Sequence, residues 1–276
     1  MSVTLYHNRN CGTSRAVLAL IRAAGIEPLV VEYLKTPPSR ATLAALVKRS
    51  GLPARALLRQ KEALFRELRL GDPALSNETA LDALAAHPAL LNRPVVVSDR
   101  GVVIARPPDA ALAVLPQLPR ERLLKENGVP YLKLTAIPAA DSAFRDALAA
   151  EHLTVDDLGE PNQMFFAAAT LDDVVVGYGG YQRRGSLALL RSLTVLPGFR
   201  GKHLGASLTA LILHRALMQD RLTEAWLLTM TAAPFFRKIG FKTMDRKDVP
   251  EDIRGSTQFS SLCPVSSTLM RKALDY

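Results

Sequence analysis

The sequence has few cysteines, few aromatic residues and no long hydrophobic run. Its 276 residues include two cysteines, Cys11 and Cys263, and 6% aromatic residues. Two distant cysteines argue against a disulfide scaffold and favour a reducing compartment. No apolar run approaches the roughly 20 residues of a membrane span, and the first 20 residues lack the layout of a signal peptide. We therefore expect a cytoplasmic protein with no membrane contact.

The patterns of metal binding and of nucleic-acid binding are also missing. No set of His, Cys and carboxylate residues has the spacing of a metal site, so we expect no metal. The net charge is +9, and the first 120 residues hold 16 of the 35 Lys and Arg but only 9 of the 26 acidic residues. Because no basic helix interleaved with aromatics accompanies this charge, we expect no nucleic-acid partner.

Cys11 is placed as a reactive thiol would be. It follows the apolar run Val3-Thr4-Leu5 and precedes a predicted helix that begins at Thr13-Ser14. Free N–H groups and the dipole at a helix N-terminus favour a thiolate. His7, four residues earlier, and Arg15, one turn later, can add positive charge. The alternative is an inert core cysteine, which needs neither a helix terminus nor flanking cations.

The same turn is suited to meet an anion. Backbone N–H groups at the start of a helix bind oxyanions. A thiolate that lies among such donors is therefore next to any anion that they bind. We therefore expect Gly12, Thr13 and Ser14 to form part of an oxyanion site next to Cys11, with His7 as its companion in catalysis.

Residues 2–117 resemble the glutaredoxin-linked arsenate reductases, which have a thioredoxin-like fold. The resemblance implies that Arg59, Arg93 and Arg106 surround Cys11 and bind arsenate, and that glutathione and glutaredoxin supply the electrons. Guanidinium groups suit this role because they bind oxyanions through paired hydrogen bonds. The resemblance to this family rests on the cysteine turn and on five further motifs that occur in the family's order. These motifs are Thr36-Pro37-Pro38, Arg55-Ala56-Leu57-Leu58-Arg59, His87-Pro88, Asn92-Arg93-Pro94-Val95-Val96-Val97 and Arg106-Pro107.

The pattern of elements predicts two α/β domains. We expect a thioredoxin-like domain with a helical insertion over residues 1–117, a proline-punctuated linker over 118–130 and a mixed-sheet domain over 131–276. Pro94, ahead of a strand, is a candidate for the cis form. The expected strands cover 3–6, 28–32, 95–98, 102–105, 132–137, 164–170, 173–181, 186–195, 222–230, 241–244 and 267–270. The expected helices cover 14–24, 39–50, 53–58, 61–69, 78–87, 108–115, 142–150, a segment ending near 218, and 232–238.

A glycine-bearing basic turn lies between a strand and a helix at Pro197–Leu208. Small residues let a backbone approach phosphates, and the helix N–H groups face them. The turn resembles the cofactor loop of GCN5-related N-acetyltransferases (GNAT), and the segment Ala233–Phe241 resembles the second half of that family's pattern. The resemblance covers residues 131–272 and implies bound acetyl-CoA. The residues implied are Leu193, Thr194 and Val195 along the cofactor, and Arg200, Gly201, Lys202, His203, Leu204, Gly205 and Ala206 around its pyrophosphate.

Two positions depart from the acetyltransferase pattern. His203 replaces the first loop glycine, and Phe236 replaces a Tyr that serves as general acid in many members. Since Phe cannot donate a proton, water, Ser207 or a residue of the late loop 257–264 would have to protonate the leaving thiolate. That late loop resembles the arsenic-resistance branch of the family.

Together these features predict a bifunctional enzyme of arsenic detoxification. The first domain would reduce arsenate, and the second would acetylate a small amine of unknown identity, with an organoarsenical among the candidates. Cys263 is remote in sequence from Cys11, which agrees with outside thiols as reductants. The alternative is a redox-regulatory binding module, of the kind that contacts RNA polymerase, fused to a non-catalytic acetyl-CoA sensor.

Overall fold

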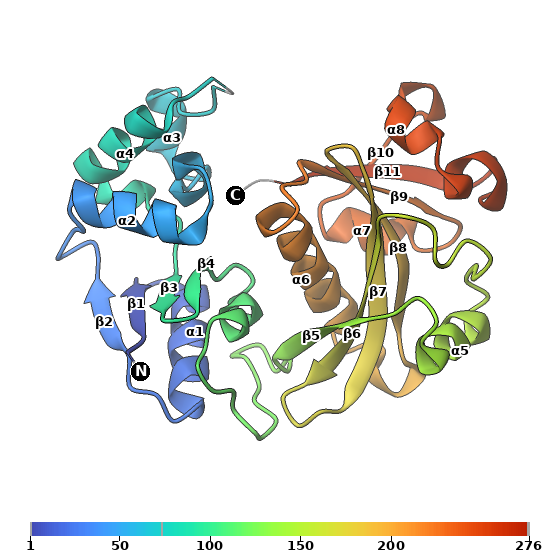
Figure 1. The fold of residues 1–276 in the computed structure, drawn as a ribbon, viewed down its shortest axis with the longest axis horizontal. Coiled ribbons are helices and arrows are strands. Elements are labelled where there is room, and N and C mark those ends of the chain that lie inside the picture. The colour runs from blue at the N-terminus through green and yellow to red at the C-terminus, as the bar shows by residue number, and fades with distance from the viewer. Residues whose placement is uncertain (1, 73, 275–276) are drawn as a thin grey trace. The chain divides into compact units, whose positions relative to one another are not determined.

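The computed structural model describes residues 2–72 and 74–274 and divides into two compact units, with the boundary between Tyr131 and Leu132 (Figure 1). Each unit has its own β-sheet and its own helices, so the fold class is mixed α/β as predicted. No helix in the described part of the chain is long and apolar enough to cross a membrane.

The first unit is built on a four-stranded sheet in the order β2-β1-β3-β4. Strand β1 runs parallel to β2, and β3 runs antiparallel to both β1 and β4. This is the expected thioredoxin-like arrangement, with helices α2 to α4 as the insertion. Its elements are β1 (Thr4–His7), α1 (Gly12–Ala23), β2 (Leu29–Glu32), α2 (Arg40–Ser50), η1 (Ala54–Leu57), α3 (Ala63–Glu67), α4 (Asn77–Ala86), η2 (Pro88–Leu90), β3 (Val95–Ser98), β4 (Gly101–Ile104) and η3 (Pro108–Ala113).

Helix α1 owes its position to an apolar stripe. Val17, Leu20 and Ile21 recur at helical spacing and are fully buried, which packs this face of α1 into the core. Cys11 is the N-cap residue with extended backbone angles, φ −102° and ψ 115°. Hydrophobic packing of α1 therefore fixes the amino end of the helix, and with it the thiol.

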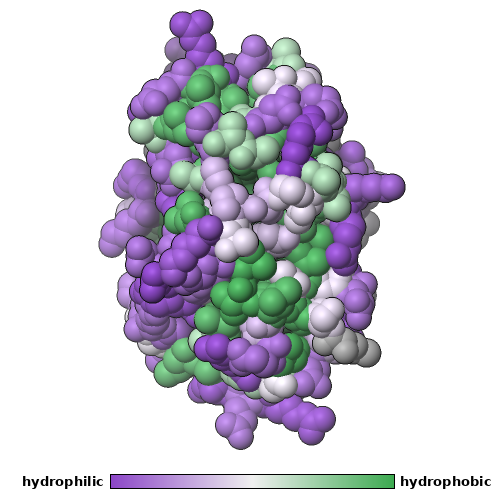
Figure 2. All heavy atoms as spheres, turned by 90° about the vertical axis from the view of Figure 1, so that its left-hand side faces the viewer, coloured by the Kyte–Doolittle hydropathy of each residue, from purple (hydrophilic) through white to green (hydrophobic). Residues whose placement is uncertain are grey.

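The edge strand β2 is short and partly apolar on its outside. Leu29 is 66% exposed and Leu34, just beyond the strand, is 50% exposed. Figure 2 shows this side of the first unit, where hydrophilic residues predominate and separate the hydrophobic areas. An ion pair between Glu32 and Lys35 places charge at the end of β2, which is a common protection of an exposed strand edge.

The stretch 118–130, expected as a linker, packs with the first unit. Tyr131 Oη donates a hydrogen bond to Ala16 O on α1 at 2.7 Å. Lys125 Nζ lies 2.8 Å from the buried carboxylate of Asp109. These contacts attach the stretch to α1 and η3, so it is an ordered part of that unit.

The second unit contains a seven-stranded sheet in the order β10-β11-β9-β8-β7-β6-β5. Only β8 and β9 are parallel among its described pairs. Its elements are β5 (Leu132–Ile137), α5 (Ser142–Ala150), β6 (Gln163–Thr170), β7 (Val175–Arg184), β8 (Leu187–Val195), η4 (Pro197–Phe199), α6 (Leu204–Met218), β9 (Glu224–Thr229), α7 (Ala233–Lys238), β10 (Lys242–Thr243), η5 (Arg246–Asp248), α8 (Glu251–Arg254), the π-helical turn η6 (Gln258–Leu262) and β11 (Thr268–Ala273).

The predicted elements agree with the observed ones except at several ends. The expected helix 108–115 is the 3-10 segment η3, and the strand expected at 267–270 continues to Ala273. The extension exists because β11 pairs with β9 over its whole length. The short helix α8 and the turn η6 were not predicted, since neither has a periodic apolar pattern long enough to detect.

Candidate active sites

The Cys11 thiol lies half-buried at the amino end of α1. Its own N–H donates to Asn8 O at 2.9 Å, which closes the turn between β1 and the helix. Ser14, one turn into α1, is fully buried. Both the N–H and the hydroxyl of Ser14 bond to the sulfur, and the N–H of Thr13 adds a third donor.

These donors determine the charge of the sulfur. Burial by itself raises the pKa of Cys11, but the N–H and hydroxyl of Ser14, the Arg106 guanidinium and the N–H of Thr13 outweigh it, so the pKa lies below the ordinary value. The thiolate is therefore more populated at neutral pH than in a typical cysteine. The reactivity of Cys11 stays a prediction, which this lowered pKa favours.

His7 differs from the positive charge expected beside Cys11, whereas Arg15 interacts both with Cys11 and with Glu126. Burial lowers the pKa of His7 below its usual value, although the Glu32 carboxylate acts in the opposite direction, so His7 is neutral at neutral pH. Its Nδ1 is buried without a hydrogen-bond partner in the described chain. Arg15 donates to both carboxylate oxygens of Glu126, at 2.9 and 3.0 Å. Arg15 still interacts electrostatically with Cys11, and Arg106 lowers the pKa of the sulfur.

Backbone hydrogen bonds bring Arg59 and Arg93 to the same place. Arg59 N donates to Leu90 O at 2.7 Å, and Asn92 N donates to Leu57 O at 2.7 Å. These two bonds align the segment that ends in Arg59 with the segment that leads into Arg93. The Arg93–Pro94 peptide is cis, as anticipated, and so is Arg106–Pro107.

Arg106 joins this pair beside the thiol. Its Nη1 donates to Arg93 O at 2.9 Å. Burial lowers the pKa of Arg106, the charges of Arg59 and Arg93 lower it further, and the Cys11 sulfur, to which Arg106 donates, raises it. Arg59 and Arg93 thus lie near Arg106, and Arg106 in turn acts on Cys11.

Glu62, which sequence reasoning missed, lies between two of the arginines. Its Oε1 is 2.6 Å from Arg59 Nε and accepts a hydrogen bond of 3.1 Å from Arg93 Nη1. The buried Nε atoms of Arg59 and Arg93 nevertheless have no hydrogen-bond partner among the described residues. A Glu three residues after an Arg is ordinary in a sequence, and only the fold places it against Arg93.

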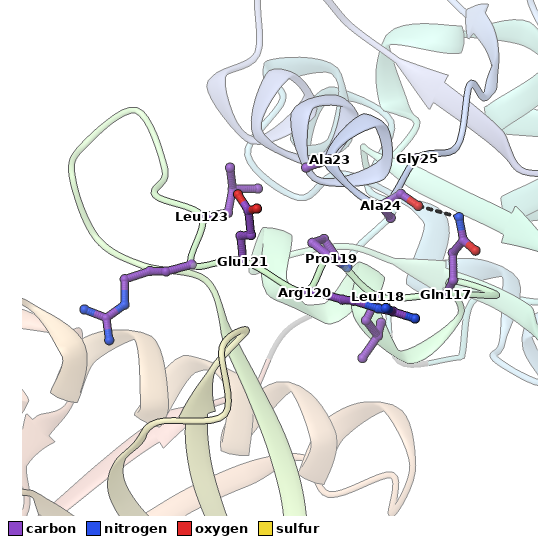
Figure 3. A pocket seen from close by; sticks show the side chains of 10 residues that line it. Ala23, Ala24, Gly25, Gln117, Leu118, Pro119, Arg120, Glu121 and Leu123 are labelled. Carbon is purple, nitrogen blue, oxygen red and sulfur yellow. Dashed lines mark hydrogen bonds between the residues drawn. The ribbon is translucent and has the colours of Figure 1, made fainter.

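A cavity in the first unit lies away from the thiol. It encloses about 630 Å³ beside Ala23, Ala24 and Gly25, at the opposite end of α1 from Cys11. Gln117 donates to Ala24 O across its wall, as Figure 3 shows. The charged side chains along it come from the segment 120–122, so it shares no residue with the cysteine site.

The second unit has an opening between two parallel strands. Strands β8 and β9 pair only over Leu187–Leu189 on β8; beyond Leu189 the described part of β8 pairs with β7 but no longer with β9. A bulge in β8 places Ser192 and Leu193 opposite the single residue Gly179, and Ser192 has φ 55°. A Cβ at Gly179 would lie 2.7 Å from Ile212 Cδ1 and 2.9 Å from Leu193 Cδ1, so a larger residue there would have to displace the ends of these side chains. The predicted cofactor strand Leu193–Val195 follows directly.

The predicted pyrophosphate loop leads from this strand into α6. Gly201 and His203 both have left-handed backbone angles, φ 75° and 58°, and His203 is the N-cap of α6. The side chain of His203 therefore occupies a conformation that favours glycine. The first-turn N–H groups, on Leu204, Gly205 and Ala206, have no acceptor inside the helix and fit a bound phosphate.

The two loop cations are engaged within the protein. Arg200 Nε donates to Val195 O at 2.9 Å, and its guanidinium pairs with Glu151. Lys202 Nζ donates to Gly198 O at 3.1 Å. The backbone donors of the helix start are thus the free part of the expected cofactor loop, and the cations shape the loop.

Phe236 is a packing residue in α7. Its side chain is 7% exposed, and its ring makes edge-to-face contacts with Phe235 and Phe241 at centroid distances of 5.0 and 5.4 Å. Phe235 in turn lies against Gly205 at the start of α6. The aromatic cluster therefore supports the end of α6 that carries the phosphate-facing N–H groups.

Asp157 forms a buried ion pair with Arg191 on β8. The two carboxylate oxygens accept from Arg191 Nη1 and Nη2, both at 2.6 Å, and both side chains are almost fully excluded from solvent. The charges of Asp157 and Arg191 both act on the pKa of the nearby Cys263 thiol. Burial raises the pKa of this second thiol, in contrast to that of Cys11.

The first unit has the fold of the thioredoxin-like class, with a half-buried cysteine at the start of its first helix. Residues 6–114 match the ArsC family, and residues 161–243 match the acetyltransferase (GNAT) domain. The arsenate reductase of Rhizobium meliloti strain 1021 is 52% identical over 132 residues, which are 48% of this chain and 94% of that protein. The chain belongs to the ArsC family and carries a GNAT acetyltransferase domain after it, so both resemblances are confirmed.

Solved structures resemble each unit separately. The arsenate reductase from Vibrio cholerae covers 42% of this chain and 98% of its own, with 45% identity and a TM-score of 0.40. An acetyltransferase of the GNAT family from Staphylococcus aureus Mu50 covers 52% of this chain and 99% of its own, with 15% identity and a TM-score of 0.39.

Proposed function

We propose that the first unit reduces arsenate to arsenite with Cys11 as the nucleophile. The observation that carries this proposal is the thiol at the amino end of α1, whose pKa is lowered by Ser14, Arg106 and Thr13 against the effect of burial. A nucleophilic cysteine needs the thiolate at neutral pH. The arsenate reductase from Rhizobium meliloti, which is 52% identical, supports the choice of substrate.

The proposed reaction begins with attack by the Cys11 thiolate on arsenic(V), which forms a sulfur–arsenic bond and releases a hydroxyl group as water. The thiolate of glutathione then supplies the second sulfur. Arsenic takes up two electrons and leaves as arsenite, while Cys11 and glutathione join in a mixed disulfide. Glutaredoxin reduces that disulfide and restores the thiol. An outside thiol is required because the first unit contains no second cysteine.

Arg59, Arg93 and Arg106 are the proposed ligands of the oxyanion. Their half-buried guanidinium groups carry positive charge in a site where a thiolate and an arsenate anion would otherwise repel each other. The N–H groups of Gly12, Thr13 and Ser14 complete the set from the side of the helix. His7, neutral and buried, we propose as a positioning neighbour of the turn.

The second unit we propose to be an N-acetyltransferase for a small amine, with an organoarsenical amine as the first candidate. Acetyl-CoA supplies the acetyl thioester. The side of β8 that faces β9, which is unpaired with β9 over Leu193–Val195, would hold its pantetheine arm by strand-like hydrogen bonds, and the N–H groups of Leu204, Gly205 and Ala206 would hold its pyrophosphate. The loop from Arg200 to His203 shapes that phosphate site.

The test is turnover by the full chain. We expect arsenite to form from arsenate when glutathione and glutaredoxin are both supplied, and coenzyme A to be released from acetyl-CoA with an amine panel that includes organoarsenicals. Thioredoxin in place of glutaredoxin should give a much lower rate. No arsenite under any thiol would favour the redox-regulatory module, and binding of acetyl-CoA without transfer would favour the sensor, which the buried Phe236 also allows.

A further inference from the structure

Two of the pocket arginines share a carboxylate that no step of the proposed reaction uses. Glu62 Oε1 lies 2.6 Å from Arg59 Nε and 3.1 Å from Arg93 Nη1. We propose that Glu62 is an internal counterion, which offsets one of the two positive charges of these arginines in the resting enzyme and is displaced when a doubly charged tetrahedral oxyanion binds. The inference rests on the proposed arsenate reductase function and adds a residue that sets the affinity of that site.

The hydrogen bonds of the pocket indicate that Glu62 is a replaceable ligand. The close contact with Arg59 Nε lacks hydrogen-bond geometry, since that atom has no partner. Arg93 Nε is likewise buried and unpaired within the described residues. Buried donors without acceptors are costly, so an anion that satisfies them gains more than the carboxylate does. A tetrahedral oxyanion offers several acceptors in different directions.

The position of Glu62 also allows it to leave. Its side chain is 31% exposed, whereas that of Arg93 is 12% exposed, so the carboxylate lies at the solvent side of the pair. Glu62 is the N-cap residue of α3, yet its side chain makes no capping bond there. A displaced carboxylate can therefore turn to water beside the first turn of α3 while the arginines stay in place.

The charges explain what such a group would do. A bound arsenate dianion competes with Glu62 for Arg59 and Arg93, whereas the product, arsenite, is an uncharged acid at neutral pH and cannot compete. Return of the carboxylate would then favour product release. Glu62 would weaken the binding of all dianions to the site. In return, it would favour release of the uncharged product after reduction.

The experiment measures binding of inorganic phosphate, which Cys11 cannot reduce, to the full chain by calorimetry. Substitution Glu62→Gln should tighten phosphate binding by about tenfold, or about 1.4 kcal/mol. The KM for arsenate should fall in parallel in a turnover assay. A residue with a merely structural role would weaken binding on substitution, so the direction of the change is decisive.

The matched control is Glu67→Gln, which removes the same charge from an exposed position of α3. We expect it to leave phosphate affinity unchanged. Glu62→Asp keeps the charge on a shorter side chain and should tighten binding less than Glu62→Gln does. Thermal unfolding of each variant shows that the fold is kept.

Unchanged or weaker phosphate binding by Glu62→Gln would overturn the proposal, and so would equal tightening by Glu67→Gln. If Glu62→Gln fails to fold, Glu62→Asp decides in its place, and phosphate binding at or below the affinity of the unmodified chain overturns the proposal. Tighter phosphate binding in a chain that does not reduce arsenate would support the counterion and refute the proposed reaction. Normal arsenate reduction without tighter phosphate binding would refute the counterion and support the proposed reaction.

Discussion

The buried pair of Asp157 and Arg191 gives the sharpest stability prediction for the second unit. Substitution Asp157→Asn removes the negative charge but keeps the shape, and it leaves the Arg191 guanidinium buried without its counterion. Removal of one partner from a buried pair costs about 3–5 kcal/mol, because the remaining charge is unpaired in a low-dielectric interior. We expect about 3 kcal/mol, since Asn keeps one oxygen that can accept one of the two guanidinium hydrogen bonds.

Trp226 makes this loss measurable. It is the only tryptophan in the chain, lies on β9 in the second unit and is 2% exposed. Its fluorescence during urea titration therefore reports unfolding of that unit, whatever the first unit does. With a slope of about 1–3 kcal/mol per molar urea, a loss of 3 kcal/mol moves the midpoint down by at least about 1 M.

Two variants separate the charge from other effects. Asp156→Asn removes the same charge from the exposed neighbour and should move the midpoint by less than about 0.3 M urea. The double substitution Asp157→Leu with Arg191→Met replaces both partners by apolar groups and should recover most of the loss. A midpoint shift for Asp157→Asn no larger than that for Asp156→Asn would refute the reasoning.

Three further predictions concern the two sites. The pKa of Cys11 is lowered and that of Cys263 is raised, so alkylation of Cys11, followed by mass spectrometry, should reach half its maximal rate at a lower pH than that of Cys263; the opposite order would contradict the thiolate assignment. Arg93→Lys should lower kcat/KM for arsenate, with a loss of about 1–3 kcal/mol of transition-state stabilisation, because lysine keeps the positive charge but lacks the planar guanidinium that donates two parallel hydrogen bonds. Unchanged kinetics would place Arg93 outside the pocket. Phe236→Tyr should leave the acetyl-transfer rate within about twofold, because a thiol of pKa about 8.5 departs without a placed acid; a rise of a hundredfold would show that the acid is missing.

The thiol site was predictable where it depends on local sequence. The Cys11 turn and helix α1 follow from one apolar run, one turn and one helical stripe, all within 20 residues. The charge of His7 was not predictable, because it depends on burial by segments far along the chain. Glu62 was missed for the same reason, since Arg93 lies 31 residues away.

In the second unit, the sequence predicted the phosphate loop but not the place where the pairing of β8 with β9 ends. The glycines and cations of the segment 200–206 indicated a phosphate loop, and its N–H groups lie at the start of α6 as expected. The engagement of Arg200 with Glu151 and the bulge opposite Gly179 depend on pairing between distant segments. No local pattern in β8 or β9 reveals where their pairing ends.

The central claim is that Cys11 performs the reduction. Serine has no accessible anion near neutral pH, so Cys11→Ser in the full chain should abolish formation of arsenite from arsenate in the presence of glutathione and glutaredoxin. The same variant should bind acetyl-CoA with unchanged affinity, which shows that the chain is folded. Arsenite production by Cys11→Ser at a rate near that of the unmodified chain would contradict the account.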